Sequence, residues 1–141
     1  MNFSMSPEEG SDLSVLGLEN KLKPVKTYEE LEIEIGDNEI LRETYKDMFN
    51  QCVKYAITVA RYNQILSKIN SEEGVDDELE KMEPIRTVVH NATIDSINIF
   101  SRQLAKSGKD NSWVGSFNGE RTKYAKFALL FALDWLAKNP Q

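Results

Sequence analysis

The chain has 141 residues and a formal net charge of −6, a length at which one domain buries an apolar core without disulfides or metals. The negative charge disfavours nucleic-acid binding, and we find neither a secretory signal pattern nor an apolar run of roughly 20 residues that would span a membrane. The single cysteine, Cys52, has no disulfide partner within the chain, so we expect a cytoplasmic protein.

Residues 1–26 are predicted to be a mobile acidic tail, because they mix polar, charged and isolated apolar residues without a regular period. Residues 27–141 are expected to form a single helical-bundle domain. The acidic residues are unevenly distributed. Residues 1–38 hold nine acids and three lysines, and residues 71–83 hold seven acids and one lysine, so each segment carries −6. The rest of the chain is therefore basic.

A short helix is predicted at 28–35. Thr27 and Glu30 match the capping-box pattern at its start, and Gly36 supplies a stop. A strand is the alternative, since apolar and acidic residues alternate over 31–35. We prefer the helix because a single strand would have no partner in this chain.

A heptad pattern predicts the first long helix, from about residue 38 to residue 70. Large or apolar side chains recur there at alternating steps of four and three: Leu41, Tyr45, Met48, Cys52, Tyr55, Val59, Tyr62, Leu66 and Ile69. Such a period, held this long, requires a near-parallel neighbouring helix. Helix pairing is therefore expected to organise the fold.

The second long helix is predicted at 77–107, where apolar residues occupy a broad arc that suits contact with two neighbours. Gly108 is expected to end this helix as a C′ residue. Pro84 either kinks the first turns or marks the true start of the helix, because proline is tolerated best in the first turn.

The third long helix is predicted at 119–138, with Asn118 or Ser116 as its N-cap. It is apolar on nearly all sides, so it is either central or shared with another chain. With only two other long helices to cover it, we expect a homodimer. The expected oligomer interface consists of Phe127, Phe131 and Trp135.

These elements together predict an all-α fold, an up-down bundle of three long helices with a short N-terminal helix. The second and third helices, 77–107 and 119–138, resemble small uncharacterised bacterial all-helical proteins grouped as domains of unknown function. The resemblance implies a bacterial, all-helical protein and implies no activity.

A basic and aromatic corner is the first candidate binding site. Arg102 and Lys106 end the second helix, Trp113 lies in the following loop, and Arg121 and Lys123 begin the third helix. The free N–H groups of a helix start already favour an anion, so added cations there point to an anionic ligand. The alternative is that the corner binds the acidic segments of this same chain.

Polar residues on the second helix are the second candidate. His90 is the only histidine, and Asn91 and Asp95 follow it on a polar stripe that suits hydrogen bonding to a ligand or partner. The alternative is a solvated helix face with a hydrogen-bonded histidine. One histidine and one cysteine are too few ligands for zinc, so we expect no metal and no cofactor.

The sequence therefore favours a non-enzymatic interaction or regulatory module that binds another protein or itself. One alternative is a small magnesium-dependent hydrolase or nucleotide-binding enzyme that uses the acidic segment 71–83 or Asp95, with His90 as general acid or base. Another is an anion or nucleic-acid binder that uses the basic corner.

Overall fold

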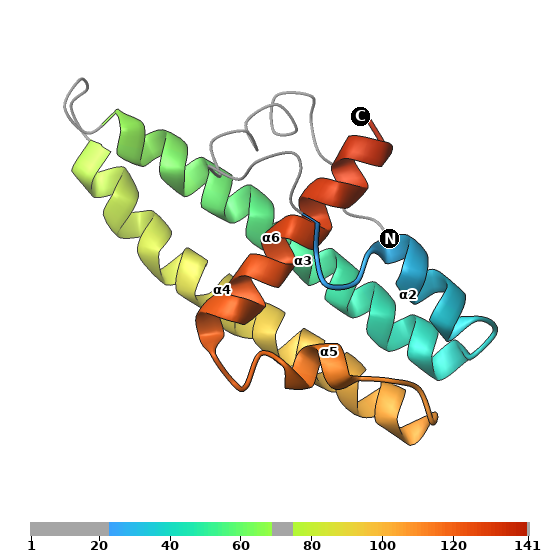
Figure 1. The fold of residues 1–141 in the computed structure, drawn as a ribbon. Coiled ribbons are helices and arrows are strands. Elements are labelled where there is room, and N and C mark those ends of the chain that lie inside the picture. Colours follow the sequence, from blue (N-terminus) through green and yellow to red (C-terminus); the bar gives the residue numbers. More distant parts are fainter. Residues whose placement is uncertain (1–22, 69–74, 141) are drawn as a thin grey trace.

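The computed structural model describes residues 23–68 and 75–140, and these residues form five helices and no strand (Figure 1). The all-helical class is confirmed, and the four predicted helices agree with the observed ones to within three residues at each end. The elements are α2 (Tyr28–Ile35), α3 (Glu39–Ser67), α4 (Val75–Lys106), α5 (Ser112–Gly115) and α6 (Arg121–Lys138).

The two longest helices, α3 and α4, lie side by side and antiparallel (Figure 1). Helix α6 crosses over both of them, α5 packs near α4, and α2 lies beside the N-terminal half of α3. The predicted up-down arrangement is not confirmed, because α6 lies across the helix pair instead of along it. None of the helices in the described part of the chain is long and apolar enough to cross a bilayer.

Capping residues set both ends of α2 and the start of α3. The Thr27 hydroxyl accepts from the amide of Glu30 at 3.2 Å, and the Glu30 carboxylate accepts from the amide of Thr27 at 3.0 Å. Gly36 ends α2 at a positive φ of 50°. The side chain of Asn38 then accepts from the amide of Leu41 at 3.0 Å and starts α3.

Helix α4 begins at Val75 and continues through Pro84. Pro84 is therefore not the start of the helix. Since proline has no N–H, the carbonyl of Glu80 lacks its usual intrahelical donor. Gly108, at φ 72°, ends the helix as expected, and the amide of Lys109 donates to the carbonyl of Leu104 at 2.8 Å, which is the Schellman pattern.

The start of α6 differs from the prediction. Neither Asn118 nor Ser116 is the N-cap: Glu120 takes this position, and its side chain accepts no capping hydrogen bond. Asn118 instead adopts a left-handed φ of 53° in the turn that precedes the helix. This turn redirects the chain so that α6 can cross the α3–α4 pair.

An aromatic core fills the crossing of α6 over α3 and α4. Phe131 on α6 is fully buried and makes edge contacts with Tyr45 and Phe49 of α3, at ring centroid distances of 6.4 and 5.7 Å. Tyr45 also contacts Phe100 of α4 at 5.8 Å. Three helices therefore meet at one group of rings, where each aromatic pair adds about 0.5–1.5 kcal/mol beyond the effect of burial.

Only part of the heptad seam is buried. The seam positions from Leu41 to Val59 are buried, whereas Tyr62 is half-buried, Leu66 is exposed and Ile69 lies outside the described residues. The reason is visible in Figure 1, where α3 and α4 extend together beyond the crossing with α6. The far ends of the two helices thus have fewer neighbours.

Part of the predicted tail lies outside the described residues, namely 1–22. Residues 23–26, which the sequence assigned to the tail, contact the helices. Pro24 is buried, and the ammonium group of Lys26 lies 2.6 Å from the carboxylate of Glu34.

We expect Phe131→Ala to lower the free energy of unfolding by about 3–5 kcal/mol, because it removes a fully buried ring and leaves a cavity. The control is Ile33→Ala on α2, whose side chain is 82% exposed, and it should change stability by less than about 0.5 kcal/mol. Urea unfolding followed by circular dichroism measures both. Equal effects of the two substitutions would contradict the crossing of α6 described above.

Candidate functional site

Three predicted site residues meet where the start of α6 touches α4. The guanidinium group of Arg121 lies 3.0 Å from Nδ1 of His90 and also donates to the side-chain carbonyl of Asn91. The ring of His90 packs edge-on against Tyr55 of α3, with centroids 5.4 Å apart. The polar stripe therefore serves, at these positions, to join three helices.

The contact with Arg121 determines the protonation state of His90. Because a guanidinium group can only donate, Nδ1 must carry a lone pair and the ring must be neutral. Burial of the ring is the main cause that lowers the pKa of His90, the charges of Arg121 and Arg86 lower it further, and the hydrogen bond with Asn91 raises it. His90 is thus held in the neutral form.

The residues of the predicted basic corner lie in different surroundings. Arg102 and Lys106 are exposed on α4, and the ammonium group of Lys123 lies 3.0 Å from the carboxylate of Glu120. Trp113 is only 6% exposed and belongs to the aromatic core, with its ring centroid 4.9 Å from that of Phe127. The large ring in this loop is therefore structural.

A basic hollow lies between residues 23–25 and the first turns of α6. It has a volume of about 370 Å³ and brings Lys23 together with Lys123 and Lys126 above the buried rings of Phe117 and Phe127. The sequence could not place Lys23 here, because that residue was assigned to the tail.

The residues of the predicted dimer interface are packed inside the chain itself. Phe127 and Phe131 are 3% and 0% exposed. Trp135 is partly buried, with its ring centroid 5.1 Å from that of Phe49 on α3. The apolar surface of α6 is therefore covered by α3 and α4. A second copy of the chain is not needed to cover it, which removes the reason for expecting a homodimer through α6.

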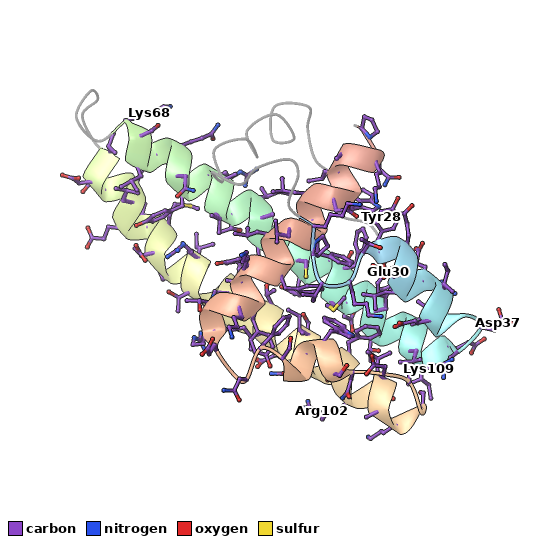
Figure 2. All side chains as sticks on the ribbon, in the orientation of Figure 1. Tyr28, Glu30, Asp37, Lys68, Arg102 and Lys109 are labelled. Carbon is purple, nitrogen blue, oxygen red and sulfur yellow. The ribbon has the colours of Figure 1, made fainter. Side chains whose placement is uncertain are left out.

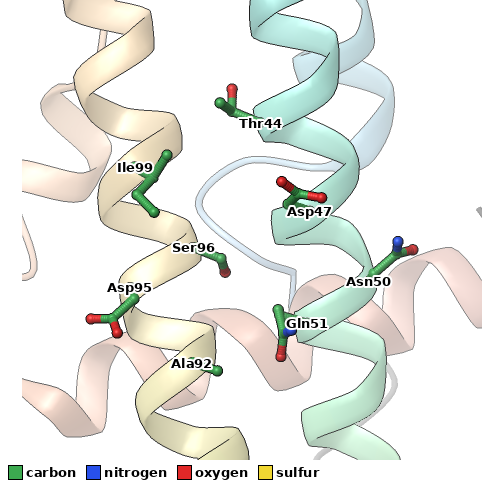
Figure 3. Close-up of a pocket in the computed structure, with 8 residues that line it drawn as sticks. All are labelled: Thr44, Asp47, Asn50, Gln51, Ala92, Asp95, Ser96 and Ile99. Carbon is green, nitrogen blue, oxygen red and sulfur yellow. The ribbon is translucent and has the colours of Figure 1, made fainter.

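A groove runs between α3 and α4 on the side that faces away from α6 (Figure 3). It has a volume of about 370 Å³, and Asp95 is the one predicted site residue that lines it. The full lining consists of Thr44, Asp47, Asn50, Gln51, Ala92, Asp95, Ser96 and Ile99. The heptad pattern of α3 marks only its apolar positions, so it gives no sign of the polar residues that α3 contributes to this groove.

Some polar atoms of this groove have no hydrogen-bond partner in the described part of the chain. The hydroxyl of Thr44 donates to the carbonyl of Leu41 at 3.0 Å, and that of Ser96 donates to the carbonyl of Thr93 at 2.7 Å. Oε1 of Gln51 is buried and has no donor. Within residues 23–68 and 75–140, no salt bridge reaches Asp47 or Asp95.

The described residues contain no group of three His, Cys, Asp or Glu side chains that could hold a metal ion. Residues 71–74 of the acidic segment lie outside this part of the chain.

Cys52 is fully buried, and burial raises the pKa of its thiol far above neutrality, so it is not available as a nucleophile. Figure 2 shows that charged side chains such as Arg102 and Lys109 lie instead at the surface.

We expect the stability of the protein to fall as the pH drops below about 6.5, the ordinary pKa of histidine. The folded state holds the pKa of His90 below this value, so the unfolded chain binds the proton more readily and acid favours unfolding. The stabilisation is complete at pH values above the pKa of His90 in the unfolded chain. It is lost as the pH falls through the pKa of His90 in the folded protein. Urea unfolding at pH 7.5 and pH 5.0 measures this.

His90→Gln is the matched control, since it keeps a polar side chain that does not titrate. Its loss of stability between the two pH values should be smaller than that of the unaltered protein. Because the chain has one histidine, an NMR titration reports its pKa directly. A value at or above 6.5 would contradict the contact with Arg121.

No family model matches the chain, and no curated protein or solved structure matches it either.

Proposed function

We propose that the protein is a helical interaction module, and that the face of the α3–α4 pair opposite α6 binds a helix of another protein. The observation that carries this proposal is a row of exposed apolar side chains on α4. Ile85, Val88 and Ile99 are 51%, 67% and 44% exposed. The row continues through Ala92, and both Ala92 and Ile99 line the groove.

The spacing of this row suits helix packing. The steps from Ile85 to Val88 to Ala92 to Ile99 are three, four and seven residues, which is the heptad period of a helix that packs along a near-parallel partner. A side chain every three or four residues stays on one helix face. The row spans 14 residues, or about 21 Å at 1.5 Å per residue, so a partner helix of about four turns would cover it.

The neighbouring row on α3 supplies the second wall of the binding face. Ile40, at 65% exposure, precedes Thr44, Asp47 and Gln51 at steps of four, three and four residues, and the last three line the groove. An amphipathic helix that places its apolar face between two helices is a recurrent mode of recognition. Here the two walls are already held in place by the core beneath them.

Charge favours a different protein over a second copy of this chain. Asp47 of α3 is exposed on this face, and Asp95 is exposed at its border, on the side of α4 that points away from α3 (Figure 3). A two-fold dimer would place the same patch against itself, and so bring these carboxylates toward their copies. Like charges in close contact oppose association, whereas a partner of complementary charge avoids this cost.

The cytoplasmic location remains part of this proposal and rests on the buried, unpaired thiol of Cys52.

We expect a photo-reactive amino acid at position 88 or 99 to crosslink the protein to one discrete partner in its native cells. The same amino acid at position 33, which is exposed on α2, away from this face, should not give that product. The purified partner should bind the unaltered protein. Val88→Asp should weaken this binding at least about tenfold, since a charge in an apolar contact costs more than 1.4 kcal/mol.

Ile33→Asp is the matched control for the binding measurement, because it places the same charge on an exposed isoleucine outside the face. Circular dichroism should show that both variants retain their helix content. Products at positions 88 and 99 that match those at position 33 would overturn the proposal, and so would products that contain only this chain.

A further inference from the structure

We propose that a recess on α3, between α2 and the C-terminal half of α6, binds a small aromatic carboxylate. This inference does not depend on the proposed function, because the recess lies on the side of α3 that carries α2 and α6 (Figure 1). The recess has a volume of about 210 Å³, and it is lined by Glu32, Arg42, Tyr45, Lys46, Phe49, Asn50 and Trp135.

Three helices form this recess. The five lining residues of α3 follow one another at steps of three, one, three and one residues, so they share one face of the helix. Glu32 of α2 and Trp135 of α6 form the walls. At one end the two flanking helices meet, since the ammonium group of Lys138 lies 2.6 Å from the carboxylate of Glu29. The fold therefore brings together lining residues that are distant in the sequence.

The hydroxyl of Tyr45 is the polar group that a ligand would satisfy. Tyr45 is 4% exposed, and its hydroxyl is buried without a hydrogen-bond partner. Burial is the main cause that raises the pKa of this hydroxyl, the charge of Glu32 raises it further, and the charge of Arg42 lowers it. Both charged residues line the recess, so the hydroxyl lies within range of their charges. Because it stays protonated, it can donate to an acceptor atom of a ligand.

The charge of the lining favours an anion. Arg42 and Lys46 contribute two positive charges and Glu32 one negative charge, which leaves a net charge of +1. Arg42 donates to the carbonyl of Gly36 and keeps further N–H groups for a second acceptor. No salt bridge within residues 23–68 and 75–140 reaches these three charged side chains. One carboxylate would neutralise the net charge and accept from the Tyr45 hydroxyl.

The apolar part of the lining favours an aromatic ring. Phe49 and Trp135 lie edge to face with their ring centroids 5.1 Å apart, and a third ring can pack against them in the same way. Asn50 points away from α4 (Figure 3), and its Oδ1 is buried without a partner. Its amide offers both a donor and an acceptor to a polar substituent of the ring. A volume of about 210 Å³ is smaller than the roughly 300–1,000 Å³ of sites for drug-sized ligands, so a single ring is the appropriate size.

Benzoate is a suitable probe of the recess, because it combines one ring with one carboxylate. We expect its titration into the full-length, isotopically labelled protein to shift the indole N–H signal of Trp135 until saturation, with a millimolar dissociation constant typical of so small a ligand. The indole signal of Trp113, which lies in the core, should not move. Benzylamine has the same ring with the opposite charge, and acetate has the carboxylate without the ring, so both should bind more weakly.

Tyr45→Phe is the most direct test, because it removes only the hydroxyl that has no partner. It should weaken benzoate binding about tenfold, the effect of losing a hydrogen bond to a charged group, without lowering the free energy of unfolding. Lys46→Gln should weaken binding about threefold, the size of an exposed ion pair. Lys54→Gln is the matched control, since it removes an exposed cation of α3 that does not line the recess, and it should leave binding unchanged.

Three results would each overturn the inference. The first is the absence of a saturable shift at Trp135, which would mean that the recess holds only water. The second is equal binding of benzoate by Tyr45→Phe and by the unaltered protein. The third is binding of benzylamine or acetate as tight as that of benzoate.

Discussion

Packing of aromatic rings at one crossing point holds the three long helices together. Tyr45 of α3 touches both Phe100 of α4 and Phe131 of α6, so a single side chain links the helix pair to the helix above it. Its ring is buried, and burial raises the pKa of its hydroxyl, which has no hydrogen-bond partner. The cost of that unpaired hydroxyl is offset by the ring contacts. The crossing also covers the apolar surface of α6, whereas apolar side chains such as Val88 and Ile99 stay exposed on α4.

Local signals explain why most elements could be predicted from the sequence. The capping box at Thr27, the stop at Gly108 and the heptad seam of α3 depend on residues close together in the chain. The position of α6 depends on distant residues. A helix that is apolar on nearly all sides has no single stripe that fixes its direction, so its sequence fits a crossing over two helices and a shared interface equally well. The oblique crossing explains why Phe131 is in the core, where a dimer interface was expected.

The candidate site also depends partly on residues that are close in sequence and partly on residues that are distant. The polar residues of α4 could be found by their helical spacing, but the stripe does not stay on one surface. Asn91 meets Arg121 of α6, whereas Asp95 is exposed and points away from α3 (Figure 3). Four residues advance a helix by about 400°, so each step turns the side chain by about 40°, and here that rotation moves it from the contact with α6 into solvent. Gln51 could not be recognised at all, because its unpaired oxygen exists only in the folded chain.

The ends of α3 and α4 beyond the crossing have a different kind of support. There the phenol of Tyr62 donates to Glu83 at 2.5 Å, the guanidinium of Arg86 lies 5.0 Å from the Tyr62 ring centroid, and Pro84 interrupts the hydrogen bonds of α4. Such a region opens locally at a lower free energy than the core, so its amides should exchange with solvent first. Ile85 and Val88 belong to this weaker region, whereas Ile99 lies beside the core. A partner helix that contacts Ile85, Val88 and Ile99 would link the core to a region that opens more easily. Binding would then slow hydrogen exchange at the far ends of α3 and α4, away from the aromatic rings.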